Sequence, residues 1–135
     1  QTRSPLVLRD IDILKQGKNL EVGFSVTTAD DHIRKLFEPN APAITNRIKA
    51  LSILHQAGIK TYAMIAPMLP GAENLAEMLA GKIDRVILDR MNYNHADWVY
   101  EKYGLQDKMT DNFFKHGKQK LISKFQKLQI DCQVV

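Results

Sequence analysis

Short apolar segments alternate with helical segments along this sequence of 135 residues. The apolar segments lie at about residues 22–26, 59–66, 85–90 and 130–135, and each is rich in aliphatic or β-branched residues. Strands that alternate with helices favour a parallel sheet with right-handed crossovers, because a helix has to carry the chain back before the next parallel strand can begin. The sequence therefore predicts an α/β fold.

The helical segments between the strands carry start and stop signals. Ser4 before Pro5 predicts an N-cap followed by the first helical position, where proline is tolerated. A helix that stops at Gly58 is indicated by apolar residues at helical spacing, namely Ile44, Ile48, Leu51 and Leu54. A longer helix begins after Thr110 or Asp111, and its expected inward residues are Phe114, Leu121, Ile122, Phe125 and Leu128.

Composition narrows the class of protein. Hydrophobic residues make up 44% of the chain, which is enough for a core, and the net charge of +4 permits a polyanionic partner without requiring one. The single cysteine, Cys132, excludes an internal disulfide and fits a reducing compartment, so we expect a cytoplasmic protein. No apolar run approaches the ~20 residues that a membrane span needs.

The chain begins with Gln1 and reaches a helix signal within a few residues. We therefore expect one domain, residues 1–135, that derives from a longer protein.

Ligands of parallel α/β sheets sit beyond the carboxyl ends of the strands, in open sheets and in barrels alike. This rule selects the candidate site residues Arg3, Ser4, Ser25, Thr27, Thr28, Pro67, Met68, Arg90, Met91 and Asn92. The Ser25 hydroxyl either bonds to neighbouring backbone or points into a polar ligand cavity, because a buried hydroxyl without a partner is costly. Arg3 is either a surface charge or a guanidinium aimed at a carboxylate or phosphate.

Several familiar motifs are missing from the sequence. It has no glycine-rich phosphate loop and no serine nucleophile elbow. Its histidines, His32, His55, His95 and His116, show no metal-ligand spacing, and each is better interpreted as a surface or helix residue.

Two segments together resemble the radical S-adenosylmethionine (radical SAM) enzymes of the spore photolyase-like group, also called DNA repair photolyases. They are TRSPLVLRDIDIL, residues 2–14, and the run from EVGFSVTTADD to PMLPG, residues 21–71. The specific feature is the combination of SVTTADD, FEPNAP, the following Arg47, LHQAGI and PMLPG, since each piece alone is weak. Support is weaker through RVILDRMN, and the resemblance ends at Asn92.

The resemblance implies a partial (β/α)6 TIM-like barrel. In such enzymes SAM lies across the strand ends, and an electron from a [4Fe–4S] cluster cleaves it to a 5′-deoxyadenosyl radical that abstracts hydrogen from the substrate. By position, Arg3 is expected near the SAM carboxylate and Ser25 near the ribose or amino-acid end, with Thr27 a weaker candidate. Ile65 and Ala66 are expected where the strand packs against adenine. Arg90 and Asn92 follow from position alone.

The chain differs from that group in the residues that bind the iron–sulfur cluster. The group holds its iron with a C-x3-C-x2-C motif, whereas this chain has only Cys132, and Fe–S clusters need several thiolates. We therefore expect the later half of a barrel whose cluster-bearing half is missing, with no cofactor bound and no activity in isolation. The parent would be a lyase or DNA repair enzyme, with DNA as a possible substrate.

Two other interpretations stay open. One is a fragment of another (β/α)-barrel enzyme that binds a phosphorylated metabolite. The other is a basic nucleic-acid-binding module that uses the lysines of the last helix, namely Lys115, Lys118, Lys120, Lys124 and Lys127. Those lysines would equally suit a solvated helix face. An incomplete barrel would also leave a sheet edge uncovered, which predicts a homodimer through that edge and no membrane partner.

Overall fold

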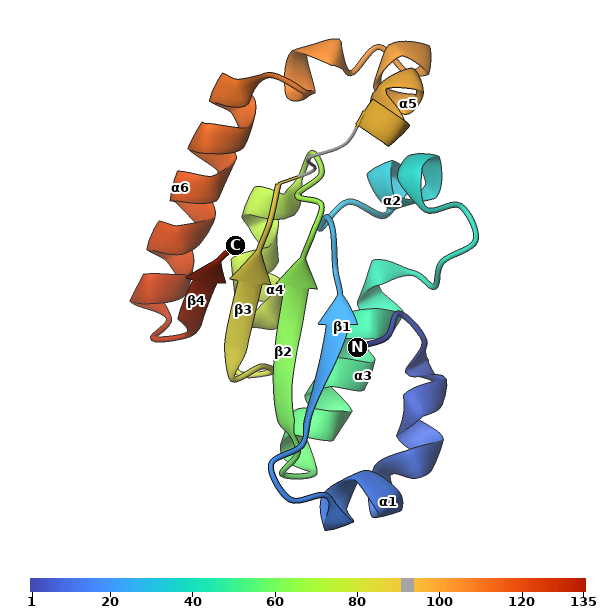
Figure 1. Cartoon of the computed structure of the whole chain (residues 1–135), viewed down its shortest axis with the longest axis vertical. Coiled ribbons are helices and arrows are strands. Elements are labelled where there is room, and N and C mark those ends of the chain that lie inside the picture. Colours follow the sequence, from blue (N-terminus) through green and yellow to red (C-terminus); the bar gives the residue numbers. More distant parts are fainter. Residues whose placement is uncertain (91–93) are drawn as a thin grey trace.

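A computed structural model describes residues 1–90 and 94–135. It contains one sheet of four strands in the order β1-β2-β3-β4, and every neighbouring pair is parallel. The strands are β1 (Glu21–Ser25), β2 (Lys60–Ile65), β3 (Arg85–Leu88) and β4 (Asp131–Val134). The predicted α/β fold with a parallel sheet is confirmed (Figure 1). The partial barrel stays a prediction.

Helices and 3-10 helices precede the first strand and connect the strands. They are η1 (Pro5–Asp10), α1 (Ile11–Gln16), α2 (Asp31–Phe37), α3 (Ile44–Gln56), η2 (Ala72–Asn74), α4 (Leu75–Leu79), η3 (Asn94–Ala96), α5 (Asp97–Lys102), η4 (Gln106–Lys108) and α6 (Asp111–Lys127). Ser4 caps η1 by accepting a hydrogen bond from the Leu6 amide, and Thr110 caps α6 through the Phe113 amide. Both predicted N-terminal caps are confirmed.

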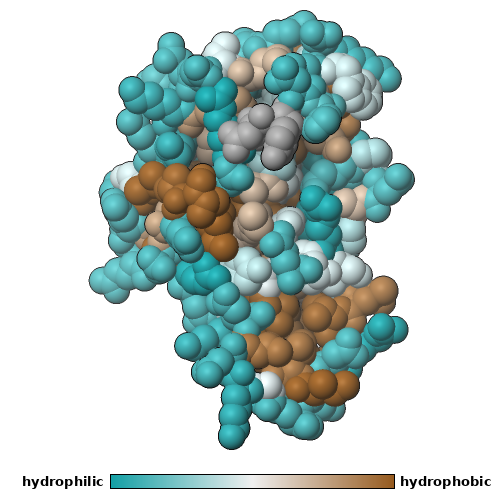
Figure 2. All heavy atoms as spheres, viewed as in Figure 1, coloured by the Kyte–Doolittle hydropathy of each residue, from teal (hydrophilic) through white to brown (hydrophobic). Residues whose placement is uncertain are grey.

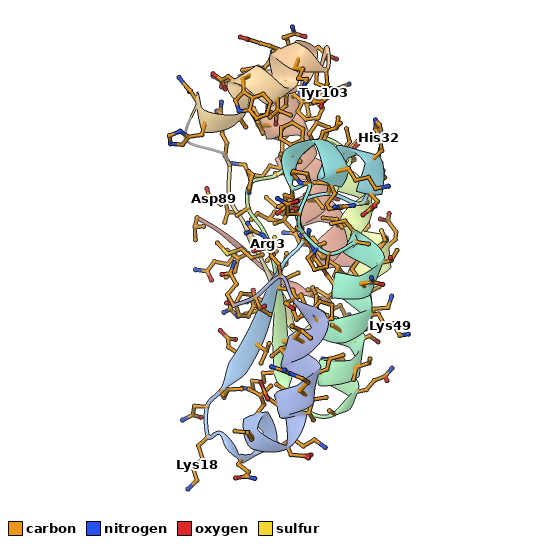
Figure 3. The ribbon with its side chains drawn as sticks, turned by 90° about the vertical axis from the view of Figure 1, so that its right-hand side faces the viewer. Arg3, Lys18, His32, Lys49, Asp89 and Tyr103 are labelled. Atoms are coloured by element: carbon orange, nitrogen blue, oxygen red, sulfur yellow. The ribbon has the colours of Figure 1, made fainter. Side chains whose placement is uncertain are left out.

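The connecting helices α3, α4 and α6 all lie on one face of the sheet, as Figures 1 and 3 show together. Alternate strand residues point into the core on that face, among them Phe24, Ala63, Ile65 and Val86, which are fully buried. The helices contribute Leu51, Leu75 and Phe125 to the same apolar cluster. Because the strand order follows the chain order, the sheet has no point at which its winding direction reverses.

The opposite face of the sheet is covered near the amino ends of the strands by its own side chains. The ring of Tyr62 lies over Gly23 so closely that a Cβ atom at Gly23 would approach the ring to 2.1 Å. The guanidinium of Arg85 stacks 4.6 Å above the Tyr62 ring and forms an ion pair with Glu21. Only the carboxyl half of this face is therefore left for another group.

One inward assignment was wrong. Leu128 is 41% exposed, although its spacing from Phe125 fits one helix face. The reason is that α6 ends at Lys127, and the chain then turns through Gln129, which has a positive φ of 57°. The helical period no longer fixes the direction of a side chain beyond the helix end. Within residues 1–90 and 94–135, no helix is both long and apolar enough to cross a membrane.

Candidate ligand site at the carboxyl end of the sheet

The first residues of the chain lie along the outer edge of β1. The Thr2 amide donates to the Gly23 carbonyl at 2.9 Å, and the Ser25 amide donates to the Thr2 carbonyl at 3.1 Å. This short parallel pairing places Arg3 beside the carboxyl end of β1, where Ser25 is the last strand residue. In Figure 3, Arg3 and Asp89, which follows β3, both lie toward that end of the sheet. Arg3 and Ser25, two candidates that are distant in sequence, therefore lie at the same end of the sheet.

The Ser25 side chain is buried but accepts only one bond. Its Oγ accepts a hydrogen bond of 2.7 Å from Nε2 of Gln1, and the residue is 4% exposed. No described residue accepts the Ser25 hydroxyl proton, so the hydroxyl keeps the capacity to donate. The Ser25 hydroxyl therefore bonds to the side chain of Gln1 and not to backbone, and its orientation into a ligand cavity stays a prediction.

The threonines after β1 hold the loops around the site. Thr27 is fully buried and donates to Oε2 of Glu38 at 3.0 Å. Thr28, also fully buried, donates to the Pro70 carbonyl at 2.6 Å and accepts from the Asp30 amide. Thr28 therefore joins the end of β1 to the turn after β2, which is a structural role.

Arg47 in α3 is the main residue of this end that strand-end reasoning missed. Its side chain is fully buried. It donates to the carbonyls of Pro42 at 2.8 Å and Ser25 at 3.1 Å, and to Oε2 of Glu38 at 3.1 Å. Burial lowers the pKa of Arg47, and the charge of Glu38 acts in the opposite direction. Its Nη2 atom is buried without a partner among the described residues.

Glu38 lies between two arginines. Its Oε2 receives Arg47 and Thr27, while its Oε1 lies 3.0 Å from Nε of Arg3. The contact between Arg3 and Glu38 is an ion pair without hydrogen-bond geometry, since Oε1 accepts no hydrogen bond from the described residues. Arg3 is 54% exposed, and its terminal nitrogens form no hydrogen bond with the described residues. Arg3, Glu38 and the segment 37–42 line a shallow cavity of about 480 Å³.

The loop from α2 to α3 is fixed by a second pair of charged side chains. Arg34 donates to both carboxylate oxygens of Asp31 at 2.9 Å and to the carbonyl of Ala41 at 2.9 Å. The hydrogen bonds from Arg34 are the main cause that lowers the pKa of Asp31 to about 2. The segment with Pro39 and Pro42 lacks regular structure but is held in place beside Glu38 by these contacts.

The remaining candidate residues are less well placed to contact a ligand with their side chains. Ile65 is fully buried in the core beneath the helices, so only its backbone is at the strand end, and Ala66 is partly buried after it. The expectation that Ile65 and Ala66 lie where the strand packs against adenine stays a prediction. Strand alternation leaves only the backbone of Ile65 for such a contact, because its side chain lies in the core with the helices. Asn92 and Met91 lie outside the described residues. Arg90 forms an ion pair with Asp111.

The lysines of α6 do not form one continuous basic surface without ion-pair partners. Lys124 is bound to Glu77 at 2.8 Å and to the Glu73 carbonyl at 2.7 Å. Lys115 and Lys118 line a separate cavity. Binding of nucleic acid by this helix stays a prediction.

This chain has few side chains that could bind the iron of an iron–sulfur cluster. Cys132 lies in β4, and burial raises the pKa of its thiol. Across the described residues, no three side chains of histidine, cysteine, aspartate or glutamate come together as a metal site would require.

Two curated relatives match about half of the chain. The chain is 42% identical over 69 residues to Uncharacterized protein MJ0683 of Methanocaldococcus jannaschii, a match that covers 51% of this chain and 27% of the relative. It is 32% identical over 71 residues to Uncharacterized protein ORF301 of Acidianus two-tailed virus, covering 52% and 24%. The matched part is thus about a quarter of each relative's length. No protein-family description and no solved structure matches the chain.

Proposed function

We propose that this chain forms part of the S-adenosylmethionine pocket of a radical SAM-type (β/α) barrel. The observation that carries the proposal is the backbone pairing of Thr2 with β1, which brings Arg3 to the carboxyl end of that strand, where Ser25 lies. A sheet whose strands follow chain order, with α3, α4 and α6 on one face, is compatible with a segment of a barrel, and it has no winding reversal at which a ligand would otherwise bind.

The residues at this end suit the amino-acid part of SAM. Arg3 offers terminal nitrogens to a carboxylate, which the planar guanidinium fits well, and Ser25 offers a hydroxyl. Arg47 and Glu38 would hold both groups in position, since Arg47 binds the Ser25 carbonyl and Glu38 binds Arg3. The adjoining cavity of about 480 Å³ is within the range of small-molecule sites, about 300–1,000 Å³. Bound SAM would supply the source of a 5′-deoxyadenosyl radical.

The [4Fe–4S] cluster does not fit this chain. One cysteine in β4 cannot replace a set of thiolates. We propose that the ligands belong to another part of a longer protein, and that the isolated chain is inactive. A lyase or DNA repair reaction, with DNA as substrate, is a proposal for that longer protein alone.

The pocket proposal predicts a difference between two ligands. Arg3→Gln is expected to weaken SAM binding about tenfold or more, because a hydrogen bond to a charged group contributes about 1.5–3 kcal/mol. Binding of 5′-methylthioadenosine, which has no carboxylate, should change less than about twofold. Isothermal titration calorimetry measures both, and Arg9→Gln, an exposed arginine of η1, is the matched control. Equal losses for both ligands, or none for SAM, would refute the assigned role of Arg3.

We also propose that the chain pairs with a second copy through β4. Residues 131–134 of β4 bond to β3 on one side, and the described residues place no strand on the other. Val134 on this strand is 44% exposed. Light scattering should give about twice the monomer mass of 15.4 kDa at high concentration. Val134→Lys should restore the monomer mass, and a monomer at every concentration would count against pairing.

A further inference from the structure

A second cavity lies at the carboxyl ends of β3 and β4, against the amino-terminal half of α6. Its volume is about 130 Å³. An engineered apolar cavity of about 150 Å³ is known to hold benzene, so the space suits one ring or a short branched chain. A nucleoside would not fit, which separates this cavity from the candidate SAM site.

Much of the wall is apolar. Met68, Leu88 and Phe114 line the cavity and are each less than 10% exposed, with Met68 at 5%, Leu88 at 1% and Phe114 at 7%. Val134 and Val135 form the outer wall and remain exposed. Figure 2 shows an apolar surface patch where Figure 1 marks the C terminus, next to this opening. An apolar body would therefore be removed from water here, which is favourable in proportion to the area buried.

The charged rim favours an anion. Arg90 is neutralised by Asp111 and stacked 4.7 Å over the Phe114 ring. Lys115 and Lys118 lie three residues apart and therefore on the same side of α6, and neither forms an ion pair or hydrogen bond with the described residues. Asp89 and the terminal carboxylate of Val135 also belong to the lining, so the charges of the lining balance, and Lys115 and Lys118 are its cations without an ion pair among the described residues.

We infer that this cavity binds a small organic carboxylate: an apolar body of about one ring, held by Met68, Leu88 and Phe114, with its carboxylate toward Lys115 and Lys118. The two free ammonium groups gain a partner, while Arg90 keeps Asp111. This binding is independent of SAM, because none of the residues involved lines the site at Arg3 and Ser25.

Benzoate is the probe that tests the inference, and its neutral analogue benzyl alcohol is the matched ligand. In an NMR titration of the 15N-labelled chain, benzoate should shift the amides of residues 88–90, 114–118 and 134–135. Benzyl alcohol should bind at least about tenfold more weakly, because it offers the lysines no charge. The double variant K115Q/K118Q should lose benzoate affinity by a similar factor.

The control variant is K120Q/K127Q, which removes two exposed lysines of the same helix that do not line the cavity. It should bind benzoate within about twofold of the unaltered chain and so separates a defined site from general attraction to a basic surface. Equal binding of the two ligands, equal loss in both double variants, or benzoate shifts confined to other residues would each overturn the inference. Arg3→Gln should leave the affinity for benzoate unchanged. A negative result for the proposed SAM site would therefore leave the carboxylate site testable, and the reverse also holds.

Discussion

Replacing Arg47 with alanine is expected to destabilise the fold by about 3–5 kcal/mol, because removal of one partner of a buried ion pair leaves the other charge with weaker compensation, here only the half-exposed Arg3 and a hydroxyl. Glu38 would lose the stronger of its two arginine contacts, and its side chain is only 13% exposed. The carbonyls of Ser25 and Pro42 would lose a donor as well. The effect should appear as a lower urea midpoint with an unchanged dependence on denaturant.

A double-mutant cycle separates the pair from simple loss of packing. R47M/E38Q removes both charges and should be more stable than R47M alone, because the double variant no longer buries the Glu38 carboxylate without Arg47. Arg9→Ala, at an exposed arginine, should change the free energy of unfolding by less than about 0.5 kcal/mol. If Arg47→Ala costs less than about 1 kcal/mol, the buried network at the end of β1 is not as described.

Phe125→Ala is expected to cost about 3–5 kcal/mol, whereas Leu128→Ala should cost less than about 1 kcal/mol. Phe125 is fully buried and joins α6 to the core, while Leu128 is 41% exposed after the helix end. The two positions lie three residues apart, and their spacing alone assigns them to the same helix face. Urea unfolding of both variants measures the difference directly. Similar costs at the two positions would mean that α6 continues through Leu128 toward the core.

The order of strands and helices could be predicted because it depends on local signals. Apolar runs and the caps at Ser4 and Thr110 each act within a few residues, and the structure confirms them. The parallel pairing followed from the alternation, since the crossover helices leave few other arrangements. The position of Ser25 at the end of β1 followed from the same rule.

The charged network could not be predicted in this way. Arg47 sits in a helix whose apolar residues explain its inward face, and nothing local indicates that an arginine on that helix is fully buried. Its partners Glu38 and Ser25 are 9 and 22 residues away, in elements brought together only by the fold. The available signal was the position of Arg47 after an acidic, proline-rich loop, which the resemblance marked but local spacing did not explain.

The side of the sheet on which a residue near the end of β2 lies depends on strand alternation. Ile65 is the last residue of β2, and alternation along the strand places its side chain in the core. Met64, one residue earlier, belongs to the face opposite the helices, and Ile65 belongs to the core. Strand ends therefore select a region of the molecule, and the strand register then selects which side chains can contact a ligand.

An NMR titration of the 15N-labelled chain with SAM tests the central claim most directly. The account predicts that the largest amide shifts fall at residues 2–3 and 25–28, where Arg3 and Ser25 meet at the carboxyl end of β1. The absence of any shift at about 10 mM SAM, a concentration above a millimolar dissociation constant, would contradict it. So would shifts that appear only around the cavity beside Lys115 and Lys118.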